Sequence, residues 1–114
     1  MDDAERTINK AIDILKNVGW CQGAWGRDSE GHPVNAQRDD IISYCLIGSV
    51  DTATRALRVA RGTNQEVRAR LGKLLPKGIA HFNDADGRKF EEVLEVLEKA
   101  KTTQVPPQEL GEFA

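Results

Sequence analysis

The chain has 114 residues, of which 39% are hydrophobic and 30% charged, with a formal net charge of −2, values that indicate one globular domain and exclude a disordered protein. No apolar run is long enough for a transmembrane helix or a signal-peptide core, and acidic residues follow Met1 directly. We therefore expect a cytoplasmic protein that binds no membrane and keeps its two cysteines reduced.

The first predicted element is a helix over about residues 3–17. Its apolar residues recur at intervals of three and four and share one broad face, as in an amphipathic helix: Ala4, Ile8, Ala11, Ile12, Leu15 and Val18. Asp2 or Asp3 is suited to cap the start. Gly19 tolerates the left-handed conformation that often follows a helix end.

The next segment, residues 19–34, contains four glycines and a proline, which exclude a helix. Residues 29–31 (Ser-Glu-Gly) predict a tight turn in a short hairpin that pairs residues 22–28 with 32–34. A lone hairpin is barely stable in water, so we expect Trp20 and Trp25 to anchor it to the helices. Stacking of either indole on a ligand is the less favoured alternative.

Residues 39–60 form the stretch around which the fold is expected to be organised. A helix is predicted to start near residue 35 or 36. Between residues 41 and 50 its apolar side chains point to every side, which is typical of a helix enclosed by its neighbours. Cys45 is then a packing residue, and Gly48 in mid-helix indicates that another backbone passes close by. The helix either continues to residue 61, before Gly62, or breaks at 49–52, where Asp51 caps a new helix.

Two further helices are predicted in the second half of the chain. Thr63 and Glu66 have the spacing of a capping box, which predicts a helix from there to Leu75, before Pro76. The last helix is predicted over about residues 88–101, with glutamates on its outer face. The fold class is therefore all-α: a compact bundle of four to five helices in a single domain over residues 1–101, with a hairpin or loop insertion at about 20–34. Residues 102–114 are predicted to form an extended or disordered tail.

Basic residues concentrate between residues 52 and 78, where seven of them occur with one acid, Glu66. Six form the candidate basic patch: Arg55, Arg58, Arg61, Arg68, Arg70 and Lys73. Such a segment is either a nucleic-acid-binding surface or a solvated face of the fold. In the second case, glutamates of the last helix are the expected ion-pair partners within the chain. The acidic total charge favours the second interpretation.

Three segments in this order resemble a family of short uncharacterised proteins from bacteria and their phages: residues 19–23 (Gly-Trp-Cys-Gln-Gly), 44–49 (Tyr-Cys-Leu-Ile-Gly-Ser) and 81–84 (His-Phe-Asn-Asp), the last followed by a helix. The resemblance covers about residues 4–101 and implies a shared fold, with Cys45, Gly48, Asn83 and Asp84 as its structural signature. It implies no activity. The chain departs from the family pattern at Ser49, Phe82 and Lys89, where Ala, Trp and a capping Thr are usual.

The same signature residues raise the question of catalysis. Cys45, His32, His81, Asn83 and Asp84 include the residue types of a cysteine-dependent hydrolase. A nucleophilic thiol needs a lowered pKa, whereas the apolar surroundings of Cys45 predict a raised pKa, so the hydrolase is an alternative and not the preferred interpretation.

No metal and no cofactor is expected. No pair of cysteines or histidines has zinc-type spacing, and the glycines at 23–26 lack the helix start and lysine of a phosphate loop. A structural role accounts for Asn83, which can bond main-chain groups, and for Asp84, which can cap a turn or pair with Arg88.

We expect a non-enzymatic protein-binding or regulatory module, and prefer a protein partner to nucleic acid. The candidate contacts lie in the loop, whose composition includes residues that interfaces favour: Trp20, Gln22, Trp25, Arg27 and His32. Leu110 and Phe113 of the tail are further candidates. Nucleic-acid binding through the basic patch is the alternative. Size and resemblance suggest a phage-derived protein acting on a host system, and the oligomeric state is open.

Overall fold

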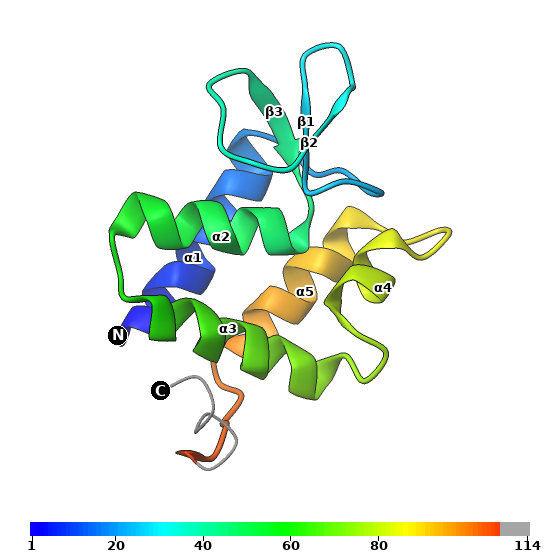
Figure 1. Ribbon diagram of the computed structural model, residues 1–114. Coiled ribbons are helices and arrows are strands. Elements are labelled where there is room, and N and C mark those ends of the chain that lie inside the picture. The colour runs from blue at the N-terminus through cyan, green and yellow to red at the C-terminus, as the bar shows by residue number, and fades with distance from the viewer. Residues whose placement is uncertain (108–114) are drawn as a thin grey trace.

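Five helices and a small sheet make up residues 1–107, the part of the chain that the computed structural model describes (Figure 1). In chain order they are α1 (Asp3–Asn17), β1 (Gly26–Asp28), β2 (Pro33–Val34), β3 (Ile41–Tyr44), α2 (Leu46–Leu57), α3 (Arg61–Leu74), α4 (Ile79–Asp84) and α5 (Phe90–Ala100). The sheet is antiparallel, with the strand order β2-β1-β3. The protein is mostly helical, as predicted, but it is not all-α.

Helix α1 lies at the centre of the core. It packs against α2, α3 and α5, and Ile8, Ala11 and Leu15 on its inner face are almost completely buried. Burial of an Ile or Leu side chain stabilises the fold by about 1.5–3 kcal/mol, so this face contributes a large share of the stability. The predicted limits are confirmed, and the Asp2 carboxylate caps the helix by accepting the N–H of Glu5 at 2.8 Å.

The predicted central helix is wrong in its first half. Residues 41–44 form strand β3, and α2 begins only at Leu46. Ile41 and Tyr44 are buried, while 51% of Ile42 is exposed. The apolar residues between 41 and 50 therefore belong to a strand and a helix, and each element buries its own face. When the same residues are placed on one helix, they point to every side. Helix α2 then continues through Asp51 without the alternative break at 49–52, and it ends at Leu57, before the predicted limit at residue 61.

The predicted hairpin is confirmed in its turn and in part of its strands. Strand β1 pairs with β2, with Gly26 opposite Val34. The Asp28 carboxylate accepts the N–H groups of Glu30 and His32 at 3.0 and 2.9 Å, and so stabilises the turn at 29–31. These main-chain donors, that of His32 first, hold the pKa of Asp28 below its usual value. The sequence did not predict β3, which pairs with the other edge of β1.

The start of α3 also differs from the prediction. Ala60 is the N-cap residue and Gly62 lies inside the helix instead of ending its predecessor. Thr63 donates its N–H to the Ala60 carbonyl, and Glu66 pairs with Arg70, so the predicted capping box does not form. The chain turns between α2 and α3 over only three residues, 58–60, which places the N-cap three positions earlier than the capping pattern indicates.

The last two helices follow a loop. Residues 79–84, which lie outside the predicted helices, form the short helix α4, and α5 spans Phe90–Ala100 within the predicted limits. The Glu92 carboxylate caps α5 by accepting the N–H of Lys89 at 2.8 Å. Of the predicted tail, residues 108–114 with the candidate contacts Leu110 and Phe113 lie outside the described residues.

Candidate functional site

Asn83 links the loop of residues 20–25 to the helices through hydrogen bonds of its side chain. Its side chain is completely buried. The side-chain oxygen accepts the indole N–H of Trp20 at 2.7 Å and the main-chain N–H of Leu46 at 3.1 Å, and the side-chain nitrogen donates to the carbonyl of Cys21 at 3.1 Å. One amide thus joins α4, the loop and the start of α2.

The loop residues that the sequence offered as partner contacts are largely engaged within the protein. The ring of Trp20 stacks on Phe90, with 5.9 Å between ring centroids. Gln22 donates its side-chain amide to the carbonyls of Asn83 and Ala85 at 2.9 and 3.0 Å. Arg27 donates to the carbonyls of residues 22 and 31. His32 is exposed on the hairpin, and its Nδ1 lies 3.8 Å from the Asp28 carboxylate.

Trp25 joins the loop to α2. Its indole N–H donates to the Asp51 carboxylate at 3.0 Å, and its ring forms a T-shaped pair with the ring of Tyr44, with 5.5 Å between centroids. Its carbonyl accepts the N–H of Cys45 and would lie 2.2 Å from a Cβ atom added at Gly48. The close backbone approach expected at Gly48 is therefore confirmed, and the loop is what approaches it.

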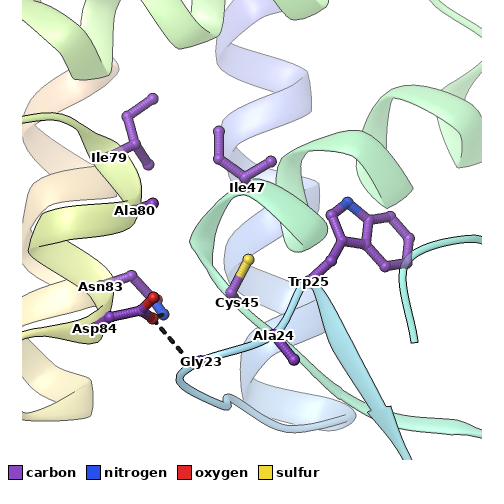
Figure 2. Close-up of a pocket in the computed structure, with 9 residues that line it drawn as sticks. All are labelled: Gly23, Ala24, Trp25, Cys45, Ile47, Ile79, Ala80, Asn83 and Asp84. Atoms are coloured by element: carbon purple, nitrogen blue, oxygen red, sulfur yellow. Dashed lines mark hydrogen bonds between the residues drawn. The ribbon is translucent and has the colours of Figure 1, made fainter. Parts of the chain in front are cut away.

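A cleft of about 300 Å³ opens beside Cys45, between the 23–25 segment, the start of α2 and α4 (Figure 2). Asp84 lies at its edge, where it accepts the N–H of Gly23 at 2.9 Å. The predicted alternative pairing of Asp84 with Arg88 does not form: Arg88 lies over the Phe82 ring and pairs with Glu92. The cleft walls are mostly apolar, so the cleft suits an apolar group.

Cys45 is half-buried and borders this cleft, which corrects the expectation of a residue enclosed on all sides. It is the N-cap residue of α2, and its sulfur accepts the N–H of Gly48 at 3.3 Å. Burial nevertheless raises the pKa of the thiol above its ordinary value, against the opposing effect of that N–H. Among residues 1–107, no histidine lines the cleft, so the arrangement that would activate the thiol as a nucleophile is not assembled.

The predicted basic patch separates into two groups. The first is engaged within the fold. Arg68 pairs with Asp51 at 2.7 Å. Arg70, only 8% exposed, pairs with Glu66 at 2.7 Å and donates to main-chain carbonyls at the end of α5. Lys73 also has an interaction partner. The acids that pair with these arginines lie on α2, on α3 and at the N-terminus, and not on the last helix as expected.

The second group is Arg55, Arg58 and Arg61, which are exposed and line one hollow of about 520 Å³ at the corner between α2 and α3. We call it the arginine hollow. Within residues 1–107, none of these three guanidinium groups has an ion pair. Arg58 has a φ of +55°, the left-handed region in which glycine or asparagine is usual at a helix end.

Asp51 is the one acid in the described lining of the arginine hollow. Its carboxylate already accepts from Arg68 at 2.7 Å, Asn64 at 3.0 Å and the Trp25 indole at 3.0 Å. Its charge is therefore balanced by Arg68, and the three exposed arginines give the hollow an uncompensated positive charge. Such a site attracts anions.

Metal-ligand clusters and membrane-spanning helices were sought in the described part of the chain. Residues 1–107 contain no group of three or more His, Cys, Asp or Glu side chains that could hold a metal ion. No helix in the same range is long and apolar enough to cross a membrane.

A family model described as a family of unknown function (DUF6197) matches residues 1–103. Neither the curated proteins nor the solved structures include a match to the chain. The family assignment agrees with the resemblance found in the sequence, whose bacterial and phage origin stays a prediction.

Proposed function

The chain belongs to this family of unknown function (DUF6197), and on the chemistry of its surface we propose that it is a non-enzymatic binding protein whose arginine hollow contacts an acidic segment of a partner protein. The observation that carries the proposal is the gathering of Arg55, Arg58 and Arg61 around one hollow without a carboxylate partner in residues 1–107. A role in regulation, a cytoplasmic location and action on a host system belong to the same proposal and rest on the size and the resemblance.

Binding is favoured over catalysis because the nucleophile lacks an activating group. The raised pKa of Cys45 keeps it protonated at neutral pH, and the described lining of its cleft includes no imidazole. The arginines, by contrast, are strong and permanently charged donors but poor general bases. They are suited to recognise an anion and not to move a proton.

A protein partner is favoured over nucleic acid because the exposed charge is compact. An extended phosphate backbone needs a basic stripe, and Arg68 and Arg70, which would continue it, are paired with acids of this chain. Arginine is also enriched in protein interfaces, where its planar group binds carboxylates in pairs of hydrogen bonds.

The test is binding of a fluorescent hexaglutamate peptide to the full chain, measured by anisotropy at low salt. We expect saturable binding that weakens about tenfold or more in the triple variant Arg55→Gln, Arg58→Gln, Arg61→Gln. The matched control, Lys16→Gln, Lys77→Gln, Lys99→Gln, removes the same charge from other exposed positions and should retain the affinity.

Two outcomes would contradict the proposal. One is absence of any peptide binding by a folded chain at low salt. The other is tighter binding of a single-stranded oligonucleotide, lost in the same triple variant and steeply dependent on salt, which would favour nucleic acid.

A further inference from the structure

We propose that the arginine hollow recognises a phosphoryl group on the partner segment. The inference rests on the proposed function, since it specifies the anion that the same site accepts. It starts from the number of positive charges that line the hollow. Phosphorylation of the partner would then be the event that controls binding.

The charge of the hollow matches a dianion better than a carboxylate. A carboxylate carries one negative charge and two oxygens, which one guanidinium group can satisfy through a pair of parallel hydrogen bonds. Arg55, Arg58 and Arg61 together present three such groups. A phosphorylated side chain carries nearly two negative charges and three strong acceptor oxygens at neutral pH, so it can engage several guanidinium groups at once.

No described lining residue neutralises the positive charge of the three arginines. Asp51 is held by Arg68, Asn64 and the indole of Trp25, through both of its oxygens. The Asp51–Arg68 pair is close to neutral, which leaves the three exposed arginines to the ligand. The indole contact also connects the hollow to the loop, so we expect an anion bound at the arginines to change the environment of the Trp25 N–H.

The size of the hollow leaves room for more than a phosphoryl group. A volume of about 520 Å³ is far more than one phosphate fills, and Trp25 and Val59 give the lining apolar surface. A peptide carrying a phosphorylated side chain supplies both parts: the phosphoryl group meets the arginines and the rest of the segment covers the apolar surface. Clusters of arginine are a recurring means of phosphopeptide recognition.

The experiment is a titration of the ¹⁵N-labelled full chain with three short peptides that differ at one position, phosphoserine, glutamate or serine, followed by amide and indole N–H signals. We expect saturable shifts of the Trp25 indole and of the main-chain amides at 55, 58 and 61 with the phosphoserine peptide. We expect about tenfold weaker binding of the glutamate peptide and none of the serine peptide. Because the second phosphate pKa is about 6, binding should weaken as the pH falls from 7.5 to 5.5.

The variants and controls separate this inference from the proposed function. The triple arginine variant, all at exposed positions, should lose the shifts while keeping a native spectrum, and the lysine control variant should keep them. Equal affinity for the glutamate and phosphoserine peptides would overturn the phosphoryl inference but leave the acidic partner in place, whereas no binding of either would overturn both. Inorganic phosphate binding as tightly as the phosphopeptide would overturn the assignment to a partner segment, and so would a tighter single-stranded oligonucleotide.

Discussion

Arg58 offers the sharpest test of the link between strain and function. Its left-handed conformation, with φ +55°, ends α2, and a side chain with a Cβ atom is disfavoured there by about 1–2 kcal/mol. Arg58→Gly removes this strain, and the main-chain N–H can still donate to the carbonyls of Thr54 and Arg55. Glycine also gains roughly 0.5–1 kcal/mol of freedom in the unfolded chain. We therefore expect a net stabilisation of about 0.5–1 kcal/mol.

The assay is urea unfolding followed by circular dichroism. For a slope of about 1–3 kcal/mol per molar, the midpoint should rise by roughly 0.2–1 M. Arg58→Ala is the control, since alanine keeps the Cβ atom and should leave the midpoint nearly unchanged. The reasoning is refuted if glycine lowers the midpoint, or if alanine raises it equally, because the gain would then come from reduced repulsion among the arginines. A more stable glycine variant with weaker anion binding would show that stability is given up for a ligand contact.

Three further predictions concern residues that position the loop or stabilise the hairpin turn. Gly48→Ala should destabilise the fold by about 1–3 kcal/mol in urea unfolding, because the added Cβ would lie 2.2 Å from the Trp25 carbonyl, although helix propensity alone predicts a gain; an unchanged midpoint would mean that the loop moves away freely. Asn83→Ala should cost about 3 kcal/mol or more, because the Trp20 indole and a main-chain N–H of α2 lose their acceptor; retained stability would contradict the central place of this amide. Asp28 has a lowered pKa in the fold, so its contribution is present above about pH 4 and is lost as the pH falls further; Asp28→Asn should flatten the acid side of the stability curve, and an identical acid transition would disprove this.

The sequence predicted which residue types make up the candidate site, but not how they are arranged in space. The concentration of basic residues between 52 and 78 was evident, and the position of Glu66 four residues before Arg70 allows an ion pair within one helix. The other carboxylate partners, Asp51 for Arg68 and Asp2 for Arg70, are distant in sequence and come into reach only when the elements pack. On a continuous helix the exposed arginines fan apart, whereas the turn at 58–60 brings them around one hollow.

The sequence by itself determined the features that depend on neighbouring residues. Helix α1 followed from apolar spacing and an acidic cap, the turn at 29–31 from its glycine, and the close approach at Gly48 from a glycine in a helical pattern. Tertiary structure alone decided how the apolar residues at 41–50 divide between β3 and α2. The reason is that β3 pairs with β1 and the start of α2 bonds to Asn83, and both partners are distant in sequence. Tertiary structure also decided the role of Asn83, whose hydrogen bonds join residues about 60 positions apart. Local periodicity describes one element at a time, whereas long-range contacts select among the elements that the periodicity permits.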